Sequence, residues 1–154
     1  DILEALFIVF TVRPWGHNIA RATLQQPKVY FYDTGLVQGD DGVRFENLVA
    51  AHLLKHTQWL NDSAGQSMGL HYIRTKDGAE VDFALSDASA AQPALTHLIE
   101  CKVADTAMHR ALKRFADANP LAQALQVVRD ARYPEEKAGI QIMPAAPWLA
   151  ELAA

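Results

Sequence analysis

The chain has 154 residues, of which 50% are hydrophobic, enough for one domain with its own core or for one domain and a fragment of another. Its formal net charge is −4, from 18 acidic and 14 basic residues, which excludes a strongly basic protein that coats nucleic acid but not an enzyme that contacts nucleic acid locally. The sequence has no apolar run of about 20 residues, no basic signal-peptide start and a single cysteine, so we expect a cytoplasmic protein without a membrane span or an internal disulfide.

The N-terminal segment differs in pattern from the rest of the chain. Residues 1–13 are apolar with little polar punctuation, and Pro14 and Gly16 then break the pattern. Since the chain also begins with Asp1 rather than Met, we interpret this segment as the tail of a preceding domain in a longer protein.

The next elements are a strand and a helix. Residues 28–32 (KVYFY) are β-branched and aromatic, which predicts a buried strand. Residues 43–57 have helical apolar spacing, and Asp40 or Asp41 provides an N-cap. The shared apolar face consists of Phe45, Leu48, Val49, His52 and Leu53, and Glu46 lies at its border. Residues 61–69 have the composition of a loop.

The second half of the chain predicts a sheet. The expected strands are 70–74, 79–85 and 95–103, followed by a helix over 105–118 and short strands over 125–128 and 140–143. Lys76-Asp77-Gly78 is a good hairpin turn between the first two strands. The three consecutive strands are expected to be antiparallel neighbours, and the strand that follows the helix is expected to be parallel to one of them. This order predicts an α/β fold with an αβββαβ core, in which helices flank a mixed central sheet.

Acidic and basic residues end two of these strands. Asp82 lies in one strand, and the next carries Glu100-Cys101-Lys102. Because side chains alternate along a strand, Glu100 and Lys102 point the same way, whereas Cys101 points to the opposite face and is interpreted as a small core residue. Two carboxylates and an ammonium on neighbouring strands can hold a divalent metal ion and position a water molecule, as a metal-dependent phosphodiesterase requires.

These residues, in this order, resemble the PD-(D/E)xK superfamily of phosphodiesterases, which has the restriction-endonuclease-like fold. Glu46 matches the acid that the family carries on a helix, Asp82 the strand aspartate, and Glu100-Cys101-Lys102 the terminal triplet. The resemblance implies that Asp82, Glu100 and the carbonyl of Cys101 bind Mg²⁺ or Mn²⁺. It also implies that Lys102 orients or activates the attacking water, and that Glu46 assists through water or a second metal ion.

Longer stretches of the text are similar to a narrower group, the C-terminal domain of many bacterial and archaeal AAA-type P-loop ATPases. The similar stretches are KVYFYDTGL, FENLVAAHLL, YIRTKDGAEVDFAL and LIECK. The resemblance implies that residues 1–27 end a winged-helix-like linker, that residues 28–154 form the nuclease-like domain, and that a P-loop ATPase domain is a partner in cis. The chain itself contains no P-loop motif. It also has no clear equivalent of the Gln or Tyr motif that some nucleases of the superfamily carry on the second helix.

Basic residues near the expected site are candidates for nucleic-acid contacts. Arg74 and Lys76 lie before the Asp82 strand, and Arg110 and Lys113 belong to a basic stripe that also includes His109 and Arg114. A solvated hairpin and a solvated helix face are the alternative interpretations. Glu80 shares a strand face with Asp82, so it is either a further ligand or a partner of Arg74 across the hairpin.

Three functional hypotheses therefore stay open. In the first, the domain is an Mg-dependent nucleic-acid phosphodiesterase, with DNA as the expected substrate. In the second, the same fold is a catalytically silent DNA- or protein-binding regulatory module of the ATPase, with Lys102 in a salt bridge between Asp82 and Glu100. In the third, it is a structural or homodimerisation domain. His52 and His56 have a spacing that suits zinc, but the sequence places no third ligand.

Overall fold

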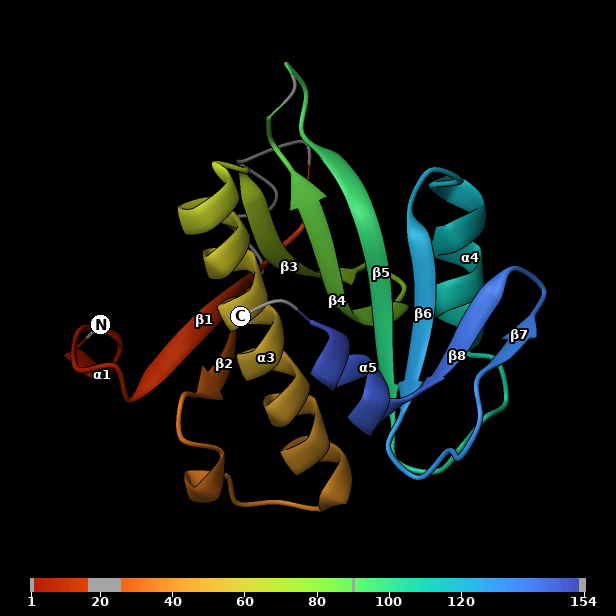
Figure 1. Ribbon diagram of the computed structural model, residues 1–154, viewed down its shortest axis with the longest axis horizontal. Coiled ribbons are helices and arrows are strands. Elements are labelled where there is room, and N and C mark those ends of the chain that lie inside the picture. Colours follow the sequence, from red (N-terminus) through yellow and green to blue (C-terminus); the bar gives the residue numbers. More distant parts are fainter. Residues whose placement is uncertain (1, 17–25, 90, 153–154) are drawn as a thin grey trace.

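The fold is a mixed α/β architecture built around one eight-stranded sheet (Figure 1). The computed structural model describes residues 2–16, 26–89 and 91–152. The helices are α1 (Ile2–Ala5), the 3-10 helix η1 (Thr34–Leu36), α3 (Asp41–Ala64), α4 (Arg110–Ala118) and α5 (Ala145–Glu151). The strands are β1 (Val9–Pro14), β2 (Lys28–Phe31), β3 (Met68–Arg74), β4 (Glu80–Asp87), β5 (Ala94–Lys102), β6 (Gln123–Val128), β7 (Glu135–Lys137) and β8 (Ile140–Pro144).

The strand order in the sheet is β2-β1-β3-β4-β5-β6-β8-β7. Strands β3, β4 and β5 are antiparallel neighbours, and β6 joins β5 in parallel after the crossover through α4. The predicted order of helix, three strands, helix and strand is therefore confirmed in α3-β3-β4-β5-α4-β6, as is the mixed sheet.

Helices cover both faces of the sheet. Helices α3 and α5 lie on one face, where Val49, Leu53 and Trp148 join a core cluster with Phe83 and Ile99. Helix α4 lies on the other face, with a smaller apolar cluster of its own. That second cluster is formed by Ile73, Val81, Ala84, Leu98, Leu112, Ala124 and Ile140.

Helix α3 is longer than predicted because its ends are capped outside the predicted range. The side chain of Asp40 accepts a hydrogen bond of 2.9 Å from the N–H of Val43, which makes Asp40 the N-cap. At the other end, Gly65 adopts the left-handed conformation (φ 64°) that ends helices. Residues 61–64, predicted to be loop, therefore belong to the last turn of the helix.

Strand β4 carries a β-bulge that controls where Asp82 points. His71 and Ile73 of β3 are two residues apart, but their partners Ala84 and Val81 are three residues apart. The extra residue breaks the alternation of side chains, so Val81 and Ala84 both pack on the α4 face. The bulge thereby turns Asp82 toward the α3 face, where it lies 3.6 Å from Lys28.

The N-terminal segment takes part in the sheet. Strand β1, from the expected linker, pairs with β2 and, through Arg13 and Pro14, with β3. The division after residue 27 stays a prediction, since residues 17–25 of that segment lie outside the described residues.

Among the described elements, α1, β1, β7 and α5 were not predicted from the sequence. Within the described part of the chain, no helix has the length and apolar character needed to cross a lipid bilayer.

Candidate metal centre

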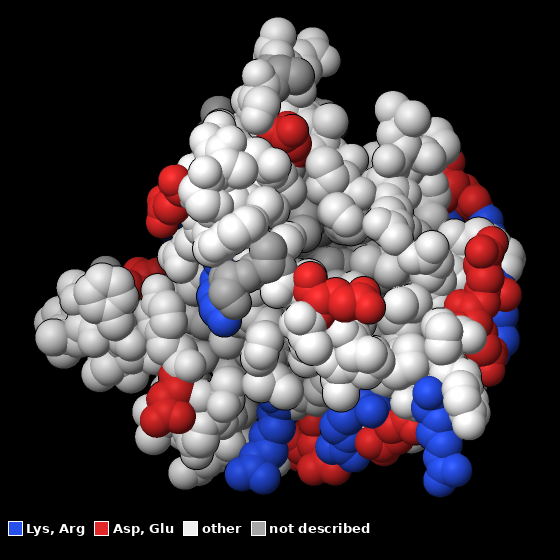
Figure 2. Space-filling view, in the orientation of Figure 1, with Lys and Arg blue, Asp and Glu red and all other residues white. Residues whose placement is uncertain are grey.

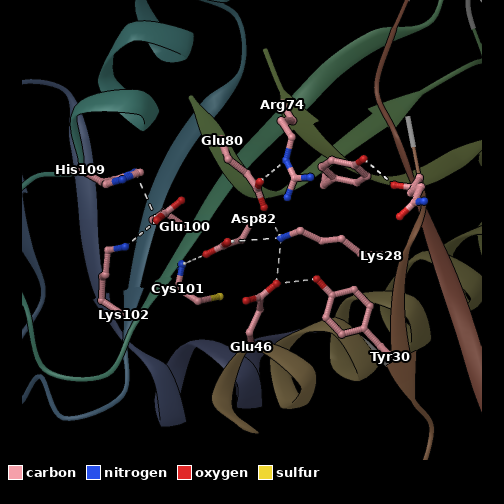
Figure 3. Close-up of polar contacts among 12 residues, drawn as sticks. Lys28, Tyr30, Glu46, Arg74, Glu80, Asp82, Glu100, Cys101, Lys102 and His109 are labelled. Atoms are coloured by element: carbon pink, nitrogen blue, oxygen red, sulfur yellow. Dashed lines mark hydrogen bonds and ion pairs between the residues drawn. The ribbon is translucent and has the colours of Figure 1, made fainter. Parts of the chain in front are cut away.

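The predicted residues Glu46, Asp82, Glu100 and Lys102 lie together at one end of the sheet (Figure 3). The paired register of β4 and β5 runs to Phe83 opposite Ile99, and there the strands separate. The Asp82 carboxylate fills this gap, where its Oδ2 accepts a hydrogen bond of 2.9 Å from the main-chain N–H of Cys101. A hydrogen bond to a side chain thus takes the place of a main-chain hydrogen bond between the two strands, and it fixes Asp82 relative to β5.

The Glu100 carboxylate lies on the α4 side of this sheet end. Lys102 Nζ donates to Glu100 Oε1 at 2.6 Å, so the two side chains share a face of β5, as predicted. His109 Nδ1 lies 3.2 Å from the same oxygen. Burial and the Lys102 ammonium lower the pKa of His109, and its Nδ1 makes no hydrogen bond with any described residue. We therefore treat the histidine as a neutral neighbour rather than an ion-pair partner.

Gln126 of β6 positions the loop that carries His109. This fully buried side chain donates to the carbonyls of Asp105 (3.1 Å) and Ala107 (2.9 Å) and accepts from the N–H of His109 (2.9 Å). Because Gln126 lies opposite Glu100 in the parallel ladder, it fixes the start of α4 beside that carboxylate.

A lysine that was not among the predicted site residues lies among the carboxylates on the α3 side. Lys28 Nζ lies 2.9 Å from Glu46 Oε1, 2.6 Å from Glu80 Oε1 and 3.6 Å from Asp82 Oδ1 (Figure 3). Tyr30, two residues along β2, donates its hydroxyl to Glu46 Oε1 at 2.6 Å. The missed signal is the alternation in KVYFY, which puts Lys28 and Tyr30 on one face of the strand.

The site holds more negative charge than its lysines neutralise. Burial raises the pKa of Asp82 to about 7, and the carboxylates of Glu100 and Glu46 add to the rise. Burial also raises the pKa of Glu100, against the opposing effect of Lys102. Burial alone would lower the pKa of Lys28, but the surrounding carboxylates raise it above its ordinary value. Such an arrangement favours an additional cation or an additional proton.

The Cys101 side chain points away from Glu100 and Lys102, toward the α3 face on which Asp82 and Glu46 also lie. It packs against the core cluster on the α3 face, as predicted for a small core residue. Burial raises the pKa of its thiol well above the ordinary value, so the thiol is not a nucleophile.

The donor atoms at this end of the sheet are of a kind that suits a divalent metal ion. Glu100 is buried, and its Oε2 has no hydrogen-bond partner among the described residues. That oxygen, Asp82 and the carbonyl of Cys101 are oxygen donors of the kind that Mg²⁺ and Mn²⁺ prefer. In the described ranges, no three His, Cys, Asp or Glu side chains are grouped to hold a metal ion, so this candidate set consists of two carboxylates and a main-chain carbonyl.

Glu80 and Arg74 form an ion pair across the β3–β4 hairpin. Arg74 Nε lies 2.5 Å from Glu80 Oε2, and the two residues are paired in the ladder. This bears out the alternative in which Glu80 is a partner of Arg74. The second oxygen of Glu80 contacts Lys28, so Glu80 connects the hairpin to the site.

The predicted nucleic-acid contacts do not form a continuous basic surface. Lys76 and Arg110 are exposed, whereas Lys113 forms an ion pair with Asp117 in α4. Arg114 forms one with Asp77 of the hairpin turn at 2.8 Å. On the face drawn in Figure 2, positive and negative side chains lie side by side along one edge.

A cavity of about 460 Å³ adjoins the α3 side of the site. Lys28, Glu46 and Glu80 contribute its charged part, and Val29 and Val43 are among its apolar residues. The charged cluster is therefore accessible from this cavity.

Fold and site together define a mixed α/β domain with a half-buried cluster of carboxylates and lysines at the sheet end. Residues 41–148, more than half of the chain, match the family described as "Domain of unknown function (DUF4143)", and the chain belongs to this family. Residues 1–43 match a second family, "Domain of unknown function (DUF8612)". No curated protein and no solved structure matches the chain.

Proposed function

We propose that this domain has the restriction-endonuclease-like fold and is a metal-dependent phosphodiesterase of the PD-(D/E)xK superfamily. The element order α3-β3-β4-β5-α4-β6 supports the fold, since it is the αβββαβ order that the resemblance implies. The positions of the acids also support it, because Glu46 lies on α3, Asp82 on β4 and Glu100 on β5.

One observation carries the proposal. Where β4 and β5 separate, Asp82 is hydrogen-bonded to the main chain of Cys101, and Glu100 keeps a buried oxygen without a partner in the described structure. Buried carboxylate oxygens that lack a donor are costly unless a cation satisfies them. A Mg²⁺ or Mn²⁺ ion held by Asp82, Glu100 and the Cys101 carbonyl removes that cost.

Each residue then has a defined task. The metal ion, when bound, supplies a Lewis acid that lowers the pKa of a water molecule and neutralises phosphate charge. Asp82 and Glu100 hold the ion, and the hydrogen bond from Cys101 keeps Asp82 in place. Lys102, whose ammonium lies 2.6 Å from Glu100, orients the attacking water and stabilises the negative charge that develops. Glu46 forms an ion pair with Lys28 and accepts a hydrogen bond from the Tyr30 hydroxyl, and it contributes to the centre through these two residues.

The proposed substrate is nucleic acid, with DNA as the first choice. Lys76 and Arg110 are exposed and so available to phosphate groups, and a cavity adjoins the site. The resemblance of four stretches to the C-terminal domain of AAA-type P-loop ATPases supports a role in cis with such an ATPase, which would direct the phosphodiesterase to its substrate.

The test is cleavage of end-labelled double-stranded DNA, single-stranded DNA and RNA in Mg²⁺ or Mn²⁺. We expect cleavage by the wild type, and a loss of about 10²–10³-fold in Asp82→Asn and in Lys102→Met, because each variant removes a group that acts in the transition state. Asp87→Asn is the matched control, since this aspartate lies on the same strand away from the site. Equal rates in the wild type and both site variants would exclude this mechanism.

A second candidate is a catalytically silent DNA- or protein-binding module with the same fold. The observation that favours it is that each carboxylate already contacts a lysine, since Lys28 pairs with Glu46, Glu80 and Asp82, and Lys102 pairs with Glu100. It predicts retention of DNA or of the ATPase domain without cleavage and without metal binding. Calorimetric titration with Mn²⁺ separates the two candidates, because only the first requires an ion at Asp82 and Glu100.

A further inference from the structure

The Lys28 ammonium is held among three carboxylates from two different elements. Its Nζ lies 2.6 Å from Glu80 and 3.6 Å from Asp82, both on β4, and 2.9 Å from Glu46 on α3. The lysine side chain is only 18% exposed, so solvent screens these contacts weakly. Lys28 is therefore the cation that all three carboxylates of this half share, whereas Arg74 contacts Glu80 from the hairpin.

The surrounding contacts fix the position of that ammonium. The Asn47 side chain accepts from the N–H of Phe31 at 2.8 Å and donates to its carbonyl at 3.0 Å, which binds β2 to α3. Tyr30 on the same strand bonds Glu46, and the ammonium also lies 5.6 Å from the centre of the Tyr72 ring. A strand held at several points delivers a fixed charge rather than a mobile one.

A divalent ion and this ammonium exclude one another. Mg²⁺, Mn²⁺ and Ca²⁺ bind oxygen at about 2.0–2.6 Å. The Glu46 and Glu80 oxygens that would bind such an ion are already within 2.9 Å of Nζ, so an ion between them would overlap the ammonium. On the other side of the site no ammonium occupies the corresponding place, since Glu100 Oε2 has no hydrogen-bond partner in the part of the chain that the structure describes.

We propose that Lys28 supplies, as a fixed ammonium, the positive charge that a second divalent ion would otherwise provide, so that the centre takes one divalent ion, at Asp82 and Glu100. This inference rests on the proposed function and specifies its metal stoichiometry. Lys28 is in this sense a positioning residue, which holds Glu46 and Asp82 without being a ligand of the ion.

The Lys28 ammonium and the carboxylates that surround it lie in segments that match two different families. Lys28 lies within residues 1–43. The four carboxylates of the centre lie within residues 41–148, and they are those of Glu46, Glu80, Asp82 and Glu100. The ammonium and the carboxylates of the centre therefore come from two separately matched segments, and the one-ion centre requires both.

The experiment is calorimetric titration with Mn²⁺ alone at pH 8, on the full chain. Lys28→Met keeps the length of the side chain and removes its charge. We expect one ion in the wild type and in Glu46→Gln, two ions in Lys28→Met, and one again in Lys28→Met combined with Glu46→Gln. If Lys28 were merely structural, its replacement by methionine would not create a second Mn²⁺ site that depends on Glu46.

Other outcomes overturn the proposal in distinguishable ways. One ion in both the wild type and Lys28→Met, or two ions in the wild type, contradicts the role of Lys28 and leaves the proposed function intact. No ion in any variant contradicts both. One ion without cleavage of nucleic acid contradicts only the proposed activity.

Folding is checked by circular dichroism and thermal unfolding with and without Mn²⁺. In Lys28→Met, Mn²⁺ should raise the Tm more than in the variant that also carries Glu46→Gln, because the additional ion binds only the folded chain. If Lys28→Met does not fold even with Mn²⁺, Lys28→Gln, which keeps a hydrogen-bond donor, is titrated in its place against the same expectations.

Discussion

The carboxylate of Asp82 accepts a hydrogen bond of 2.9 Å from the main-chain N–H of Cys101, where the pairing of β4 with β5 stops. This contact replaces a missing ladder hydrogen bond with one from a side chain. It also places this half-buried carboxylate close enough to Glu100 and Glu46 for their charges, together with its burial, to raise its pKa. Local strand geometry thus produces the electrostatics of the centre.

Asp82 makes the stability of the metal-free protein depend on pH. Its pKa is about 7 in the folded state and 3.8 ordinarily. An acid with a raised pKa stabilises the folded state below its unfolded pKa, and this contribution disappears as the pH rises through the folded pKa. Between pH 5 and pH 8 we expect the wild type to lose on the order of 2 kcal/mol relative to Asp82→Asn. Denaturant unfolding at a series of pH values measures this difference.

The matched control for this prediction is Asp87→Asn on the same strand. A hydrogen bond from Ser89 lowers the pKa of Asp87, so this residue stays ionised throughout the range and its substitution should leave the slope unchanged. A slope in Asp82→Asn equal to that of the wild type would show that Asp82 titrates near its ordinary pKa.

Gln126 is expected to be a large contributor to stability. Its buried amide satisfies three main-chain groups, of Asp105, Ala107 and His109. Gln126→Leu leaves these groups without their partner, so we expect a loss of about 2–4 kcal/mol in the free energy of unfolding. Gln123→Leu, on the exposed end of the same strand, should change it by less than about 0.5 kcal/mol. Similar losses of unfolding free energy in the two variants would show that the hydrogen bonds of Gln126 are not the source of its contribution to stability.

Regular elements made much of the site predictable from the sequence. Along β5 the side chains alternate without interruption, so Glu100 and Lys102 share a face and Cys101 packs on the other. The helical period similarly predicted that Phe45 and Val49 lie on the side of α3 that faces the core, with Glu46 at the border of that side.

Irregular and long-range features were not predictable in this way. The bulge in β4 depends on how β3 pairs with it, and no periodicity within β4 reports that. The contact of Lys28 with Glu46 spans 18 residues and depends on where β2 docks on α3. Helix α5 was missed because it contains Pro147, yet a proline in the first turn of a helix removes no helical hydrogen bond.

Asn47 holds strand β2 on helix α3 and so positions Lys28. Its side chain is buried and forms both of its hydrogen bonds with the main chain of Phe31. Asn47→Ala leaves these buried groups unsatisfied, so we expect a loss of about 2–3 kcal/mol in unfolding free energy. The control is Gln58→Ala on the exposed face of the same helix, which should fall within about 0.5 kcal/mol of the wild type. A loss in Asn47→Ala no larger than in the control would mean that β2 is held by its core contacts alone.

Metal binding at the proposed centre should strengthen as the pH rises. An ion at Asp82 must displace the proton that this carboxyl carries below its pKa of about 7. The apparent Mn²⁺ affinity should therefore rise about tenfold per pH unit below pH 7 and level off above pH 8, with about one proton released per ion at the low end. Calorimetry in two buffers of different ionisation enthalpy measures both quantities. Glu80→Gln is the control, because the pKa of Glu80 is lowered through its Arg74 and Lys28 partners and its loss should leave this pH dependence unchanged. An affinity that does not vary between pH 6 and pH 8 would exclude Asp82 as the ligand that titrates.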